Sequence, residues 1–213
     1  GMRFIGGRYD PSAVRALSAS VRPGMTVYDV GAHVGYLTLL AAQRVGRQGR
    51  VIAFEPLPLN LRYLRGHLRA NHLSQVSLVE ACVSDRAGPV HFDPGKGTGR
   101  GRLQSQVAGR FRSVTIDEEV AAGRLPPPGF IKMDVEGAEL LALRGARQTL
   151  LTHRPEILLS VHGEQLKQDC STFLTGLGYT VLAGEKPGEI LARWAATVAT
   201  PTHEGHRSVI RDR

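Results

Sequence analysis

Short apolar runs alternate with amphipathic stretches along most of the chain, from Met25 onward. This alternation is typical of a parallel sheet whose strands are joined by crossover helices. The apolar runs predict strands at 25–30, 50–55, 76–80, 130–134 and 156–161, a short strand at 113–116, and a final pair at 179–183 and 189–193. Apolar residues at helical spacing predict helices at 11–19, 36–45, 57–71, 137–150 and 164–177.

The final pair of strands is close enough in sequence to form a hairpin. We therefore expect an α/β fold of Rossmann-like type, with a mostly parallel seven-stranded sheet, helices on both faces and a C-terminal antiparallel hairpin. The expected organisation is a short lead-in helix within residues 1–24, one domain over 25–195 and a polar, loosely held tail over 196–213.

Local signals refine these elements. Gly46 should end the helix at 36–45, and Asp117 is the expected N-cap of a short helix after the strand at 113–116. Glycines interrupt residues 93–110, which predicts a loop. One face of the helix at 57–71 should be buried by four leucines, Leu57, Leu61, Leu64 and Leu68.

Composition narrows the class of protein. The 213 residues fit one sizeable domain, and 42% hydrophobic with 22% charged residues is typical of a globular enzyme. Cys82 and Cys170 lie far apart, so neither a disulfide framework nor a paired-cysteine metal site is expected. No stretch reaches the roughly 18 apolar residues of a membrane span, and the N-terminus lacks an apolar secretory stretch, so we expect a cytoplasmic protein.

A net charge of +8 raises the question of a nucleic-acid partner. The basic residues are mostly arginines, and they occur in nearly every segment without an interleaved basic and aromatic run. Stacking platforms for nucleic acid need such a run. A solvated basic surface is therefore favoured over an RNA-binding patch, which stays the alternative.

The first chemical motif follows the first predicted strand: Asp29, then Gly31, Ala32, His33, Gly35 and Tyr36. Its spacing fails the dinucleotide fingerprint G-x-G-x-x-G. It resembles instead the methyltransferase pattern of an acidic residue followed by G-x-G-x-G, with His33 at the central glycine. Histidine enters the left-handed region more often than most residues, so this turn can still form. The resemblance places Asp29 near the amino-acid part of the cofactor; a turn that needs glycine for geometry alone is the alternative.

Two further segments continue this site. Glu55, followed by Pro56, ends the second predicted strand, where its carboxylate can accept hydrogen bonds from both hydroxyls of a ribose. The alternative is a solvent-exposed glutamate at a strand end. Cys82, Val83 and Ser84 follow the third strand, at the expected adenine edge, although Cys82 can equally belong to the core.

The most distinctive run is Phe130–Glu139, with three carboxylates within six residues where a strand meets a helix. Together with the preceding motifs, over residues 25–163, it resembles the FkbM family of methyltransferases and its K-x-D-x-E-G-x-E signature. The resemblance implies a class I fold, S-adenosyl-L-methionine as cofactor, and O-methylation of a natural-product or sugar-like small-molecule acceptor.

Residues of this run are candidates for catalysis. Asp134 is best placed to bind the sulfonium and align the reacting atoms. Glu136 and Glu139 either take part in catalysis with it or stabilise the helix start. Lys132 points to the same strand face as Asp134 and should pair with a carboxylate or orient the acceptor. His162, after the next strand, is a candidate general base, and a structural role is the alternative. The family often has an acidic residue where Ser160 stands, which leaves the partner that orients His162 undefined.

Several alternatives remain. Asp134, Glu136 and His162 could hold a divalent ion, but without a compact ligand motif we expect no metal. Arg100 and Arg102, in the glycine-rich stretch, could close over an acceptor. Rival functions are an RNA methyltransferase, a non-catalytic S-adenosylmethionine-binding module and, third, a nicotinamide-dependent reductase. The sequence does not define the acceptor or the oligomeric state.

Overall fold

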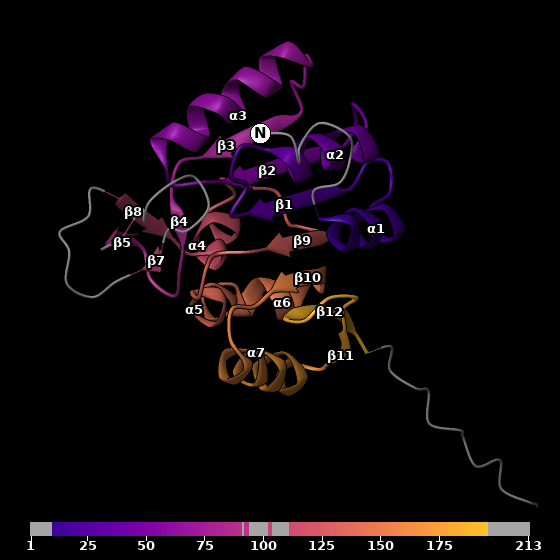
Figure 1. The fold of residues 1–213 in the computed structure, drawn as a ribbon, viewed down its shortest axis with the longest axis vertical. Helices are drawn as coiled ribbons and strands as arrows, with labels where there is room; N and C mark the ends of the chain where they lie inside the picture. Colours follow the sequence, from indigo (N-terminus) through magenta and orange to yellow (C-terminus); the bar gives the residue numbers. More distant parts are fainter. Residues whose placement is uncertain (1–9, 91, 94–101, 104–110, 196–213) are drawn as a thin grey trace, which may run out of the picture.

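The computed structural model describes residues 10–90, 92–93, 102–103 and 111–195. Its main feature is a seven-stranded sheet in the order β3-β2-β1-β9-β10-β12-β11 (Figure 1). The strands are β1 (Thr26–Val30), β2 (Arg50–Phe54), β3 (Val76–Val79), β9 (Phe130–Met133), β10 (Glu156–Ser160), β11 (Tyr179–Ala183) and β12 (Glu189–Trp194). The first five strands of this order pair in parallel, while β12 is antiparallel to both β10 and β11. The predicted mostly parallel sheet with a C-terminal antiparallel hairpin is confirmed.

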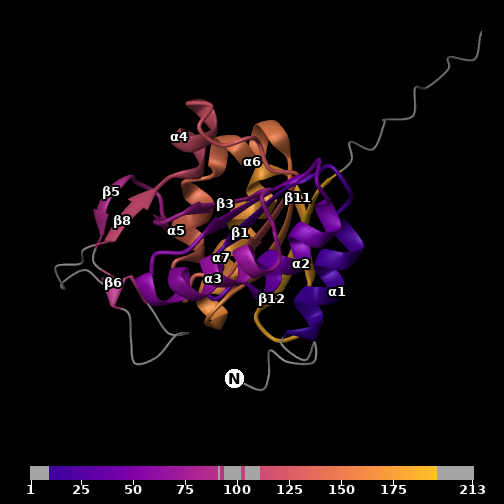
Figure 2. The same cartoon turned by 90° about the horizontal axis from the view of Figure 1, so that it is seen from above.

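Helices cover both faces of the sheet (Figure 2). They are α1 (Pro11–Ser20), α2 (Tyr36–Val45), α3 (Pro58–Ala70), α4 (Ile116–Ala121), α5 (Glu139–Arg144), α6 (Arg147–His153) and α7 (Glu164–Leu177). The bounds predicted for α2 and α7 are confirmed to the residue, and Gly46 is the C-cap of α2. The four leucines predicted to bury one face of the helix at 57–71 are all buried.

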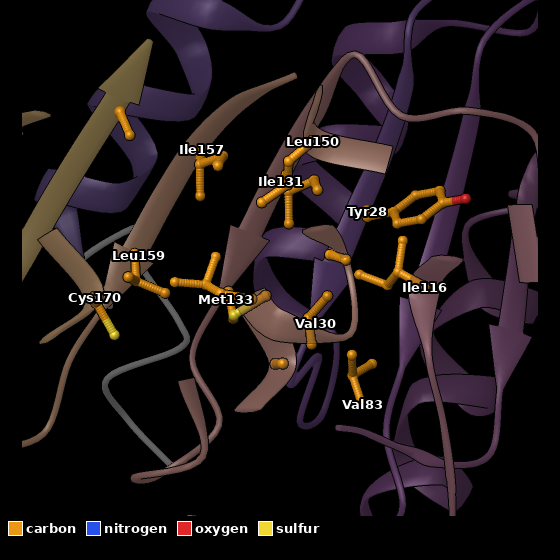
Figure 3. Close-up of a cluster of buried hydrophobic side chains, with 14 of the residues drawn as sticks. Tyr28, Val30, Val83, Ile116, Ile131, Met133, Leu150, Ile157, Leu159 and Cys170 are labelled. Atoms are coloured by element: carbon orange, nitrogen blue, oxygen red, sulfur yellow. The ribbon is translucent and has the colours of Figure 1, made fainter. Parts of the chain in front are cut away.

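The core follows from alternation along the central strands, because successive side chains of a strand point to opposite faces. Tyr28, Ile131 and Ile157 hold matching positions on β1, β9 and β10 and form one buried row, which packs with α5, α6 and α7 (Figure 3). On the other face, Val27 and Phe130 pack with α1 and α2. Burial on both faces explains why these strands are almost continuously apolar in sequence.

The prediction of one continuous helix at 137–150 is wrong. The structure has two helices there, α5 and α6. The break falls at Gly145 and Ala146, the C-cap of α5 and the N-cap of α6. A Cβ at Gly145 would lie 1.9 Å from the backbone oxygen of Ser84. The chain therefore bends where it packs against the segment after β4 (Cys82–Val83), a contact that local periodicity does not encode.

The predicted N-cap of α4 is also wrong. Thr115 is the N-cap, and its side chain accepts a hydrogen bond from the amide of Glu118. Asp117 lies inside α4, and its carboxylate accepts hydrogen bonds from the amides of Gln148 and Thr149 at 2.9 and 2.7 Å. Asp117 therefore satisfies free amides at the start of α6, a helix that lies 30 residues later in the chain.

Two small sheets were not predicted. One joins β4 to β8 (Phe111–Val114) and β5 (Gly88–Val90), and the other pairs β6 (Phe92–Asp93) with β7 (Arg102–Leu103). Most of the glycine-rich stretch at 93–110, including Arg100, lies outside the described residues, as does the tail at 196–213. Arg102 begins β7. Within the described part of the chain, no helix has the length and apolarity needed to cross a bilayer.

Candidate functional site

The predicted site residues meet at one edge of the sheet. Because β1, β2, β9 and β10 run parallel, their carboxyl ends share an edge, and the segments that follow them lie side by side there. The amide of Gly31 donates to the carbonyl of Phe54, and the amide of Asp134 donates to that of Val30, each at 3.0 Å. These bonds hold the glycine-containing turn next to the ends of β2 and β9.

The turn between β1 and α2 has the backbone that its sequence predicts. Gly31, His33 and Gly35 have φ angles of 78°, 53° and 94°, so His33 adopts the left-handed conformation expected of it. A Cβ at Gly31 would lie 1.9 Å from the backbone oxygen of Asp134, and one at Gly35 would lie 2.2 Å from Leu64 Cδ1. Packing against the backbone at Gly31 and the positive φ angles of both residues thus require glycine, so their presence does not by itself indicate a ligand.

Glu55 is buried beside this turn with 4% of its surface exposed, which rules out a solvent-exposed strand-end glutamate. Its carboxylate accepts hydrogen bonds from the His33 amide at 2.8 Å, the Leu57 amide at 2.9 Å and the Asn60 side chain at 3.1 Å. Burial raises the pKa of Glu55, although these bonds and the charge of Lys132 oppose that rise. A carboxylate has about four lone-pair positions, so about one remains for a ligand.

Asp29 and Lys132 form a buried ion pair next to the turn between β1 and α2. Lys132 Nζ lies 3.2 Å from Asp29 Oδ1 and donates to the Gly31 carbonyl at 2.9 Å. Thr38 donates to the other carboxylate oxygen at 2.6 Å. The predicted pairing of Lys132 with a carboxylate is confirmed. Lys132 bonds the turn at Gly31, and Asp29 links Lys132 to Thr38 of α2, so the pair fixes the position of the turn relative to β9 and α2.

The remaining predicted cofactor residues differ in burial. Ala32, Cys82, Val83 and Ser84 are buried, and Tyr36 and Pro56 are partly exposed. Burial raises the pKa of the Cys82 thiol to about 12, and the negative charge of nearby Glu55 adds to this rise, so the thiol is protonated at neutral pH. The segment predicted at the adenine edge is therefore close to Glu55.

Four side chains form a second group, which we call the carboxylate–histidine group: Asp134, Glu136, Glu139 and His162. His162 Nε2 lies 3.8 Å from Asp134 Oδ1 and 3.5 Å from Glu136 Oε2, and Nδ1 lies 3.1 Å from Glu139 Oε1. Glu139 has none of its surface exposed, whereas the other three side chains are about one-third exposed. Three residues predicted to be catalytic, Asp134 and Glu136 after β9 and His162 after β10, therefore lie side by side. The fourth, Lys132 on β9, pairs with Asp29 instead.

The sequence left the partner that orients His162 undefined, because Ser160 stands where the family often has an acidic residue. The structure shows that this partner is the carboxylate of Glu139. The same oxygen, Oε1, also accepts a hydrogen bond from the Gly137 amide at 3.0 Å. The bond to Glu139 raises the pKa of His162. Burial opposes ionisation of Glu139, but the bonds from His162 and Gly137 outweigh it and lower the pKa of this carboxyl. The sequence signal was the last glutamate of the signature run, for which catalysis and a role at the helix start were the two predicted alternatives, neither of them the orientation of His162.

Comparison with known proteins identifies the family to which the chain belongs. Residues 29–192 match the methyltransferase FkbM domain. The hexuronic acid methyltransferase AglP of Haloferax volcanii is 26% identical over 146 residues, covering 67% of this chain and 59% of the relative. A ribosomal protein L11 methyltransferase of Pelotomaculum thermopropionicum is 33% identical over 135 residues, covering 62% of this chain and 39% of the relative. The chain thus spans roughly two to three fifths of the length of these relatives.

Solved structures share the fold. A methyltransferase FkbM from Methylobacillus flagellatus has a TM-score of 0.62 and 20% identity, over 85% of this chain and 50% of that one. Fibrillarin from Aeropyrum pernix, solved with bound S-adenosyl-L-methionine, has a TM-score of 0.55 and 13% identity, over 85% of this chain and 75% of that one. The fold is therefore that of the class I methyltransferases. Because the family match also includes the glycine turn, Glu55 and the carboxylate–histidine group, the protein belongs to the FkbM methyltransferase family.

Proposed function

We propose that this methyltransferase moves the methyl group of S-adenosyl-L-methionine onto a hydroxyl of a small, sugar-like acceptor. The observation that carries the proposal is the adjacency of two sites: the buried Glu55 with its glycine turn, and the carboxylate–histidine group. The Asp134 amide donates to Val30, directly before the turn, so the two sites share an edge. The hexuronic acid named for the Haloferax volcanii relative supports a sugar-like acceptor.

The residues around Glu55 fit the cofactor. The remaining acceptor position of Glu55 suits one ribose hydroxyl, and a second hydroxyl bond would require the carboxylate to release a protein donor. A ribose diol is neutral, whereas a 2′-phosphate would be repelled by this buried carboxylate. We assign the amino-acid end to the turn, the ribose to Glu55 and Pro56, and the adenine edge to Cys82, Val83 and Ser84. The turn contributes Asp29, Gly31, Ala32, His33, Gly35 and Tyr36.

The carboxylate–histidine group supplies the acceptor side. S-adenosyl-L-methionine, when bound, provides an electrophilic methyl group on a cationic sulfonium. Asp134 and Glu136 favour positive charge beside them and align the acceptor oxygen. Glu139 holds His162 Nδ1, so Nε2 is the ring nitrogen that faces the acceptor and, in the simplest form of the mechanism, takes its proton. Lys132 positions the turn and β9 without touching the reacting atoms.

Calorimetry and a transfer assay test this proposal separately. We expect the protein to bind S-adenosylhomocysteine, and we expect methyl transfer from labelled S-adenosylmethionine to hexuronic acids or other sugars in an acceptor panel. The panel also contains bulk RNA, and salt-sensitive RNA binding with RNA methylation would support the rival function instead. Binding without turnover on any acceptor would favour a non-catalytic module, and failure to bind S-adenosylhomocysteine would overturn the cofactor assignment.

A further inference from the structure

We propose that Asp134, Glu136 and His162 bind one divalent cation, Mg²⁺ or Mn²⁺, which in turn binds two neighbouring oxygens of the acceptor. The binding site follows from the geometry of the carboxylate–histidine group alone. Only its use in catalysis rests on the proposed function.

The distances from His162 Nε2 to Asp134 and Glu136 fit a shared ion better than they fit hydrogen bonds. His162 Nε2 is 3.8 Å from Asp134 Oδ1 and 3.5 Å from Glu136 Oε2, beyond the 2.7–3.2 Å typical of N–H···O bonds. One ligand atom from each of the three residues lies within 4.8 Å of the others. Around an octahedral ion with bonds of about 2.1 Å, adjacent ligand atoms are about 3 Å apart and opposite ones about 4.2 Å apart. Small side-chain movements would bring all three onto one ion.

An unpartnered atom points to the same place. Asp134 Oδ1 is buried, and within the described part of the chain it accepts no hydrogen bond, although buried carboxylate oxygens are normally satisfied. This is the oxygen that faces His162 Nε2. A cation between these two atoms would satisfy the oxygen and use the nitrogen lone pair at the same time.

Glu139 provides the support that a metal-binding histidine needs. Because a carboxylate only accepts hydrogen bonds, the neutral His162 ring donates from Nδ1 to Glu139 and keeps its lone pair on Nε2. Histidine ligands of metals usually donate their other nitrogen to a carboxylate in this way. Glu139 is fully buried and fixed by the Gly137 amide, so the orientation of the ring is set in advance.

The charge of the group favours a cation as well. Three carboxylates converge on one imidazole, which carries at most one positive charge, so the four side chains keep a negative charge. That charge would repel an anionic acceptor such as a hexuronate unless a cation lies between them. Two carboxylate oxygens with one imidazole nitrogen suit Mg²⁺ or Mn²⁺ better than the softer ions that favour thiolates.

A bound cation changes the role of His162 from base to ligand. An acceptor with a vicinal diol or an α-hydroxy carboxylate would bind the ion through two oxygens, and the ion would lower the pKa of the hydroxyl. The hydroxyl proton leaves to solvent water, the oxygen forms a bond to the methyl carbon, and the carbon–sulfur bond breaks with its electron pair on sulfur. The products are the methyl ether and neutral S-adenosylhomocysteine.

Titration of the full chain with Mn²⁺, followed by electron paramagnetic resonance, tests the site without an activity assay. We expect one site from which Mg²⁺ displaces Mn²⁺. The variants Glu136→Gln and His162→Gln should weaken Mn²⁺ binding about 10-fold or more, and Glu139→Gln should do so through the orientation of His162. Glu164→Gln, at the exposed start of α7, is the matched control and should bind as the wild type does.

Calorimetry with S-adenosylhomocysteine and thermal melting accompany each variant, so that misfolding is recognised. Absence of Mn²⁺ binding at millimolar concentration, or wild-type Mn²⁺ affinity in both Glu136→Gln and His162→Gln, would overturn the cation site. If S-adenosylhomocysteine still binds in that case, the proposed function stands with His162 as the base. A protein that binds Mn²⁺ but not S-adenosylhomocysteine would instead keep the site and lose the proposed function. Full transfer activity in EDTA would overturn the catalytic use of the ion.

Discussion

Glu55 is the residue on which the cofactor assignment most depends, and it is already bonded by the protein. Replacing it with Gln removes the charge and places an NH₂ group beside one of its present amide donors. We expect Glu55→Gln to weaken S-adenosylhomocysteine binding about 10-fold to 100-fold, since a hydrogen bond to a charged group contributes about 1.5–3 kcal/mol. Glu80→Gln, at the exposed end of β3, is the control. Equal affinity of wild type and Glu55→Gln in calorimetry would contradict the assignment.

Burial of Glu55 also predicts how stability changes with pH. Its pKa is raised in the folded protein, despite the donors His33, Leu57 and Asn60 and the nearby charge of Lys132. A raised pKa means that the folded state binds the proton more tightly, so this contribution to stability is present at low pH and is lost as pH rises through the raised value. Urea unfolding at several pH values should show wild type losing stability relative to Glu55→Gln as pH rises. A constant difference would contradict this.

The Asp29–Lys132 pair shows how a predicted catalytic candidate can have a structural role. Lys132→Met would leave Asp29 buried at 2% exposure without its cation, and we expect this to lower the free energy of unfolding by about 3–5 kcal/mol. The double variant Asp29→Asn with Lys132→Met removes both charges and should recover much of that loss. Denaturant unfolding of the single and double variants measures the difference. If the double variant is as unstable as Lys132→Met alone, charge burial is not the cause.

At the scale of elements, the sequence predicted what periodicity encodes and missed what tertiary contacts decide. Helices α2 and α7 have apolar residues at regular spacing and a glycine at the C-cap, so their bounds could be predicted closely. Asp117 looks like a local N-cap, but Thr115 takes that role and Asp117 binds the start of α6. A capping acceptor can serve any free amide that lies nearby, and sequence alone does not show which helix the fold brings there.

Gly145, between α5 and α6, allows a matched test of such a tertiary contact. Its φ angle of −73° is open to alanine, so a side chain is opposed by the close approach of the described backbone at the Ser84 carbonyl and Asp85 Cα. We expect Gly145→Ala to lower the free energy of unfolding by about 1–3 kcal/mol through overpacking. Because Ser84 lies in the proposed adenine segment, S-adenosylhomocysteine affinity should fall too.

Gly66, inside α3, is the control, since a Cβ there meets no atom of the described residues within 4 Å. Gly66→Ala should raise the free energy of unfolding by about 0.5–1 kcal/mol, because alanine favours a helix over glycine. Chemical denaturation of the two variants decides the case. Equal effects of the two substitutions would show that the contact at Ser84 is not what requires glycine at residue 145.

At the scale of the whole molecule, the sheet could be predicted from the sequence, whereas the contacts within the site could be predicted only in part. Long apolar runs define buried parallel strands, and parallel strands bring their carboxyl ends together whatever the loops do. That rule was enough to gather Asp29, Glu55 and Asp134 at one edge. It could not show that Glu139 orients His162, because these two residues are 23 apart in the chain and their contact depends on how α5 packs against α7, which follows His162.

The same distinction applies to α1, which the sequence assigned to a lead-in before the main domain. Leu17 has 1% of its surface exposed and packs in one cluster with Val27, Phe130 and Leu158 of three central strands. If α1 completes the core, Leu17→Ala should lower the free energy of unfolding by about 2–5 kcal/mol, as in other buried leucine sites. Leu59→Ala, at a position that is 50% exposed on α3, should change it by less than about 0.5 kcal/mol. Urea unfolding monitored by circular dichroism separates these outcomes. A change at Leu17 as small as that at Leu59 would mean that the sheet is stable without α1 and that the domain does begin near residue 25.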